Sequence, residues 1–131
     1  MEYIFDPAVI EKLDLTDLRP LPSNLEMRPL LKSDHQNNFL SILAQLTKVG
    51  DISKSEYDAR FDQMKNSNCY FVLVVVDHDQ ESKIIGTATL ILEQKFIRKC
   101  ALKGRVEEVS PRLECSAQNV SETIKICGIL K

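Results

Sequence analysis

The stretch Tyr70-Phe-Val-Leu-Val-Val-Val76, followed by Ile84-Ile-Gly-Thr-Ala-Thr-Leu-Ile-Leu92, decides the fold. The first run is an unbroken series of β-branched, aromatic and aliphatic residues, which is typical of a strand buried on both faces. The second run has the same character, and the residues between them, Asp77 to Lys83, form a polar turn. Together they predict an antiparallel hairpin at the centre of a sheet.

Further strands are expected on both sides of this hairpin. Gly104-Arg-Val-Glu-Glu-Val109 follows a charged connection, Glu93 to Lys103, and predicts the next strand. Leu25-Glu-Met-Arg-Pro29 alternates in polarity, and its proline favours an edge position because proline cannot donate to a ladder. Ser110-Pro111-Arg112 is turn-forming material, and we expect the third strand to end before it.

Helical signals occupy the segments between the first strand and the hairpin. Apolar residues recur at helical spacing after Ser33 and Asp34 and again after Ser53. The second of these begins with the form of a capping box, in which a serine hydroxyl and a glutamate three residues later satisfy free backbone N–H groups. The expected helices are a short one opened by Asp6-Pro7, one from Ser33-Asp34 to about Val49, and one from Ser53-Lys-Ser-Glu56 to Asn66-Ser-Asn68.

The composition is that of an ordinary soluble domain. The chain has 131 residues, of which 44% are hydrophobic and 27% charged, with a net charge of -2. This balance excludes a strongly basic nucleic-acid-binding surface. The acidic N-terminal segment does not resemble a signal peptide, and the longest apolar run is too short to cross a bilayer. We therefore expect no transmembrane segment and a cytoplasmic protein, with peripheral association with endomembranes as a second possibility.

The cysteines give no metal-binding pattern. Cys69, Cys100, Cys115 and Cys127 form no C-x-x-C pair, and two histidines are present to assist them. We expect no metal and four free thiols, most of them buried.

Several blocks of the sequence resemble one known family. They lie in the same order as in that family and extend over about residues 5 to 120. The blocks are Phe5-Asp-Pro7, Leu46-Thr-Lys-Val-Gly50, Thr87-Ala-Thr-Leu-Ile-Leu-Glu-Gln-Lys-Phe-Ile97, Gly104-Arg-Val-Glu-Glu-Val109 and Leu113-Glu-Cys-Ser-Ala-Gln-Asn-Val120. On these residues the chain resembles the glucosamine-6-phosphate N-acetyltransferases of the GCN5-related N-acetyltransferase superfamily.

The resemblance implies an α+β fold, but an incomplete one. We expect an antiparallel meander sheet with two early helices. In the family, the strand matching residues 104–109 leads into a glycine-rich loop and a long helix that bind the pyrophosphate of coenzyme A. Here Val109 is followed directly by Ser-Pro-Arg-Leu-Glu-Cys115, so we expect this helix and the C-terminal strands to be lacking. The expected organisation is an N-terminal extension with a short helix over 1–24, a partial acetyltransferase domain over 25–120 and a divergent tail over 121–131.

The implied activity is acetyl transfer from acetyl-CoA, as cosubstrate, to the amine of glucosamine 6-phosphate, by direct attack on the thioester. The family is homodimeric and uses no permanently bound cofactor. The alternative for this chain is a catalytically inactive truncated or alternatively spliced isoform, either unstable or acting as a binding protein. Loss of the helix would leave apolar side chains on one face of the sheet uncovered.

The resemblance also assigns roles to single residues. Glu107 is expected to take the proton from the substrate amine, and the backbone N–H of Val109 to stabilise the developing oxyanion. Because adjacent strand residues face opposite sides, only one of Glu107 and Glu108 can face the cleft. The implied substrate-binding residues are Thr47, Lys95, Phe96, Ile97, Arg98, Glu107, Glu108 and Glu114, and the implied cofactor-proximal residues are Val109 and Asn119.

The residues alone leave simpler interpretations open for several of these positions. Thr47 could be a partly exposed threonine that bonds local backbone. Lys95 and Arg98 could be solvated charges of a surface loop. Arg98 also replaces a residue that is commonly histidine in the family.

Overall fold

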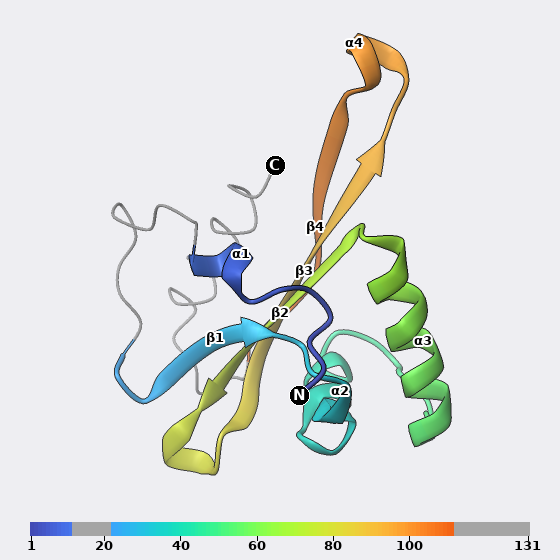
Figure 1. The fold of residues 1–131 in the computed structure, drawn as a ribbon. Helices are drawn as coiled ribbons and strands as arrows, with labels where there is room; N and C mark the ends of the chain where they lie inside the picture. Colours follow the sequence, from blue (N-terminus) through green and yellow to red (C-terminus); the bar gives the residue numbers. More distant parts are fainter. Residues whose placement is uncertain (12–21, 112–131) are drawn as a thin grey trace.

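The computed structural model describes residues 1–11 and 22–111, and it is an α+β fold around one antiparallel sheet (Figure 1). Within these residues the sheet has four strands in the order β1-β2-β3-β4. The predicted meander is therefore confirmed. The strands are β1 (Leu25–Pro29), β2 (Tyr70–Asp77), β3 (Lys83–Gln94) and β4 (Leu102–Pro111), and the helices are α1 (Ala8–Glu11), η1 (Lys32–Gln36), α2 (Phe39–Leu43), α3 (Lys54–Ser67), η2 (His78–Gln80) and α4 (Ile97–Cys100).

Strand β2 is buried on both faces, as its sequence predicts. On one face Val72, Val74 and Val76 pack in a cluster to which α2 and α3 contribute Ile42 and Phe61. On the other face Leu73, Ala88 and Leu90 form a second cluster, against which Phe5 and Ile10 pack from the N-terminal segment. From the missing helix we expected apolar side chains on one face of the sheet to be uncovered. Leu73 and Leu90 on this second face have no exposed surface, so that expectation is wrong for these two residues.

Strand β4 is longer than the sequence predicts. Ser110 and Pro111 continue the ladder with β3, opposite Thr87 and Gly86, where a turn was expected. Proline is tolerated in an edge strand, where its missing N–H can face away from the ladder, and β4 forms one edge of the described sheet. The opposite edge of the described sheet is β1, which carries Pro29, as predicted.

The helix predicted from Ser33 to about Val49 does not form as one unit. Short helices η1 and α2 are separated by Asn37 and Asn38, and Asn38 is left-handed with φ 68°. The Asn37 side chain donates a hydrogen bond to Ser82 O in the turn before β3, and the Asn38 side chain donates one to Ile84 O of β3. Both hydrogen bonds are 3.0 Å long. Asparagine tolerates the left-handed conformation well. The hydrogen bonds to β3 and its turn therefore form in place of those that a continuous helix would make.

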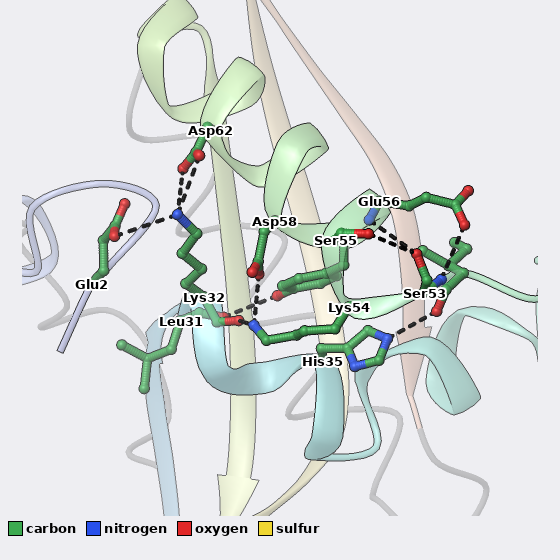
Figure 2. A network of polar contacts seen from close by, with 12 residues as sticks. Glu2, Leu31, Lys32, His35, Ser53, Lys54, Ser55, Glu56, Asp58 and Asp62 are labelled. Carbon is green, nitrogen blue, oxygen red and sulfur yellow. Dashed lines mark hydrogen bonds and ion pairs between the residues drawn. The ribbon is translucent and has the colours of Figure 1, made fainter.

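Helix α3 begins and ends where its sequence predicts. Ser53 caps the helix and Glu56 bonds back to the Ser53 N–H, while Asn68 ends it with φ 57°. Polar contacts then fix α3 against η1 and the N-terminal segment (Figure 2). Lys32 Nζ lies 2.9 Å from Asp62 of α3 and 3.7 Å from Glu2.

A buried ion pair joins β1 to η1. Arg28 donates two hydrogen bonds to Asp34, at 2.7 and 2.9 Å, and Leu31 N donates a third at 2.7 Å. The Asp34 side chain is 3% exposed and that of Arg28 is 14% exposed. Because the carboxylate has three donors, its charge is well compensated, and the pair sets where the chain leaves the sheet.

Replacing one partner of this pair should destabilise the fold strongly. Asp34→Asn leaves Arg28 charged and largely buried, and we expect the free energy of unfolding to fall by about 3 kcal/mol. Urea denaturation measures this change. The control is Asp58→Asn, which removes the exposed pair with Lys54 and should cost less than about 0.5 kcal/mol. Equal effects of the two substitutions would contradict the role given to Asp34.

Candidate functional site

A cleft lies between helices α2 and α3 and the face of the sheet that they cover. Its volume is about 430 Å³, within the range that accommodates small ligands. Its walls are mostly apolar. The lining residues are Ile4, Leu30, Phe39, Leu40, Leu43, Ile52, Glu56, Tyr57, Arg60, Phe61, Met64, Tyr70, Val72, Thr89, Ile91 and Arg105.

The floor of the cleft is formed by β3 and the start of β4. Thr89 and Ile91 contribute to the lining from β3, and Arg105 contributes from β4. In the ladder, the backbone of Glu107 is opposite Thr89, two residues beyond Arg105. The predicted acid–base residue Glu107 is therefore placed, by its backbone, next to the cleft.

The pairing of β3 with β4 is irregular at this point. Thr89 is paired with Glu107 and Thr87 with Ser110, so β4 has one residue more than β3 between the two pairs. Glu108 and Val109 occupy this bulge. A β-bulge removes regular ladder partners from the backbone of the bulged strand. The backbone of Val109, predicted as an oxyanion donor, thus lies where strand pairing is interrupted.

Thr47 lies just beyond the end of α2. It is exposed, and its backbone N–H donates to Leu43 O at 3.4 Å, which closes a last helical turn. It does not line the cleft, although Leu43 does. Thr47 is therefore at the helical rim of the cleft and not inside it.

The predicted sugar-phosphate loop is at the tip of the β3–β4 hairpin. This tip carries α4 and projects far from α2 (Figure 1). Phe96 and Ile97 are 94% and 66% exposed there, and Lys95 Nζ lies 3.7 Å from Glu93. Within one chain, the structure does not bring Lys95, Phe96, Ile97 and Arg98 together with Thr47.

Two other predicted residues, Glu114 and Asn119, lie outside the described residues. So do Cys115 and Cys127. Cys69 is partly exposed and Cys100 is exposed, so the expectation of mostly buried thiols is wrong for the two cysteines that the structure describes. Among the side chains that the structure describes, those of residues 1–11 and 22–105, no group of three from His, Cys, Asp and Glu could hold a metal ion. No helix in these ranges is long and apolar enough to span a membrane.

Sequence reasoning missed the polar residues of the cleft wall, notably Thr89 and Tyr57. The Tyr57 hydroxyl donates to Leu31 O at 2.9 Å. Burial raises the pKa of Tyr57 well above its ordinary value, and the negative charges of Asp34 and Asp58 raise it further. The phenol therefore stays protonated and holds α3 to the β1–η1 connection.

The comparisons with known proteins agree with this architecture. No family model matches the chain. It is 39% identical over 118 residues to a probable glucosamine 6-phosphate N-acetyltransferase of Drosophila melanogaster, covering 82% of this chain and 53% of that protein. It is 30% identical to the glucosamine 6-phosphate N-acetyltransferase of Arabidopsis thaliana, covering 68% of this chain and 60% of that protein. The chain thus spans about half the length of the curated relatives it matches.

The fold has solved counterparts. The crystal structure of glucosamine-6-phosphate N-acetyltransferase from Arabidopsis thaliana matches with a TM-score of 0.75 at 25% identity, over 81% of this chain and 73% of that chain. A Trypanosoma brucei acetyltransferase matches with a TM-score of 0.66 at 26% identity, over 80% of this chain and 73% of that chain. The chain belongs to the GCN5-related N-acetyltransferase superfamily. Within it, the sequence is similar to the glucosamine 6-phosphate N-acetyltransferases, which confirms the resemblance inferred from its blocks.

The buried phenol of Tyr57 predicts a pH dependence of stability. Above about pH 10, the ordinary tyrosine pKa, the unfolded chain ionises Tyr57 while the folded chain keeps the proton, so stability should fall as pH rises. The free energy of unfolding, measured by urea denaturation at about pH 9 and about pH 11, should fall more between the two pH values for the wild type than for Tyr57→Phe. Tyr70→Phe, which keeps Tyr57, should behave as the wild type. Equal slopes for the wild type and Tyr57→Phe would contradict this assignment.

Proposed function

We propose that the chain transfers acetyl from acetyl-CoA to the amine of D-glucosamine 6-phosphate. The products are N-acetyl-D-glucosamine 6-phosphate, a precursor of UDP-N-acetylglucosamine, and free coenzyme A. The observation that supports the proposal is the bulge of β4 at Glu108 and Val109, which follows Glu107, the ladder partner of the cleft residue Thr89. The names of the relatives supply the substrates.

The proposed reaction is a direct attack without a covalent enzyme intermediate. Glu107 takes a proton from the substrate ammonium, directly or through water, and the free amine attacks the thioester carbonyl. The Val109 N–H stabilises the negative charge that develops on the carbonyl oxygen. The carbon–sulfur bond then breaks, and the departing thiolate takes, directly or through water, the proton that the attacking nitrogen loses. Holding amine and thioester together supplies much of the remaining rate gain.

The ladder supports Glu107, rather than Glu108, as the acid–base residue. The β3 partner of Glu107 is Thr89, and the Thr89 side chain lines the cleft. Glu108 lies in the bulge, where the ladder gives it no β3 residue directly opposite.

A thiol-release assay with acetyl-CoA and glucosamine 6-phosphate tests this function. Glu107→Gln should lower kcat/KM by about 100-fold, because it removes the base and keeps the shape. Glu81→Gln, which makes the same change at an exposed carboxylate in the turn between β2 and β3, is the control and should remain near the wild type. Absence of thiol release from the wild-type protein, with both substrates at saturating concentration, would defeat the proposed activity and favour a non-catalytic protein.

We further propose that the chain acts as a homodimer, in which the hairpin tip of one copy serves the site of the other. The tip is far from α2 of its own chain (Figure 1), and Phe96, Ile97 and Leu102 are 94%, 66% and 62% exposed. Exposed apolar groups of this size, gathered at one place, are typical of an interface. A second copy would cover them and receive Lys95 and Arg98 near its Thr47, where cations suit a sugar phosphate.

Sedimentation equilibrium tests the dimer. The wild type should sediment as a dimer, and Phe96→Ser should shift the protein toward monomer because it removes the most exposed apolar side chain of the tip. The control is Glu81→Ser, because Glu81 is an exposed residue of the turn between β2 and β3, at the other end of β3 from the tip. A monomeric wild type, or a dimer that persists in Phe96→Ser and dissociates in Glu81→Ser, would refute the proposed interface.

A further inference from the structure

Two threonines of β3 differ in one respect that their sequence positions do not show. Thr87 and Thr89 are two residues apart, so they lie on the same face of the strand. Both are buried, with 3% and 2% of their surface exposed. The Thr87 hydroxyl donates to Leu73 O at 2.9 Å, whereas the Thr89 hydroxyl has no hydrogen-bond partner among the side chains and backbone that the structure describes.

An unpartnered buried hydroxyl needs a reason, because removing a polar group from water without a compensating hydrogen bond is unfavourable. Thr87 shows that a threonine on this face can be satisfied by the backbone of β2. Thr89 is not, and valine would fill the same space without the unpaired hydroxyl.

The position of Thr89 indicates what the hydroxyl contacts. Its side chain lines the cleft, and its backbone is opposite Glu107 at the edge of the β4 bulge. Four other polar side chains of the lining already have partners within the protein. Glu56 accepts from Ser53 N, Tyr57 donates to Leu31 O, Arg60 donates to Gln63, and Arg105 is paired with Glu93 at 2.6 Å.

We propose that the Thr89 hydroxyl is a specificity-determining group that hydrogen-bonds a ring hydroxyl of the acceptor sugar at the floor of the cleft. This inference rests on the proposed function and refines it. A threonine hydroxyl both donates and accepts, which matches a sugar hydroxyl that does the same. A phosphate would instead call for charged donors, and Thr89 carries no charge.

The matched pair of threonines provides the experiment. Thr89→Val should weaken binding of glucosamine 6-phosphate about tenfold in isothermal titration calorimetry, the size expected for one lost neutral hydrogen bond. Its urea midpoint should equal or exceed that of the wild type, since no intramolecular bond is lost. Thr87→Val should do the reverse, with a lower urea midpoint and an affinity within about twofold of the wild type.

A third variant separates the hydroxyl from the shape of the side chain. Thr89→Ser keeps the hydroxyl and removes the methyl group, so it should retain most of the affinity that Thr89→Val loses. If Thr89→Ser binds as weakly as Thr89→Val, the contact is one of packing and the inference is wrong.

The outcomes distinguish this inference from the function on which it rests. If the wild type binds glucosamine 6-phosphate and Thr89→Val binds it equally well, the role of Thr89 is refuted while the proposed acceptor stands. A lower urea midpoint for Thr89→Val with unchanged affinity would show that an internal water satisfies the hydroxyl, which also refutes the role. If the wild type does not bind glucosamine 6-phosphate, the proposed function fails, and the inference fails with it.

Discussion

The burial of β2 on both faces is the constraint on which the rest of the described structure depends. Its residues alternate between two apolar clusters, so elements must be supplied to each side of the sheet. Helices α2 and α3 cover one side, and Phe5 and Ile10 of the N-terminal segment pack on the other. A strand of this kind cannot lie at an edge, so β1 and β3 must flank it. The cleft lies between α2, α3 and the part of the sheet formed by β2, β3 and β4.

Most of the sheet and helix α3 could be predicted because their signals are local. Continuous β-branched residues specify β2, and a serine with a glutamate three residues later specifies the start of α3. The helix expected after Ser33 was wrong because its interruption is tertiary. Asn37 and Asn38 bond to the turn before β3 and to β3 itself, segments more than 40 residues away in the chain. Nothing in the local sequence shows that these partners are within reach.

The sequence suggests candidate site residues, which stay predictions, but it does not show how they are arranged. The blocks around Thr47, Lys95 and Glu107 were found from the sequence, and the relatives confirm the family they belong to. The separation of Lys95 from Thr47 was not foreseen, because it follows from the length of the β3–β4 hairpin and the direction in which it projects. Thr89 was missed for another reason. In the sequence it cannot be told from Thr87, since only the fold decides which hydroxyl finds a carbonyl.

The bulge of β4 and the unpaired hydroxyl of Thr89 lie at the same register position, and we regard this as one feature. A regular ladder satisfies its own backbone groups and leaves nothing to offer a ligand. One extra residue in β4, at Glu108 and Val109, interrupts that pairing beside the cleft, where the Thr89 hydroxyl also has no partner among the described residues. The sheet therefore lacks internal hydrogen bonds at the place where a ligand can supply them. The apolar clusters on both faces of β2 supply the stability that makes this local loss tolerable.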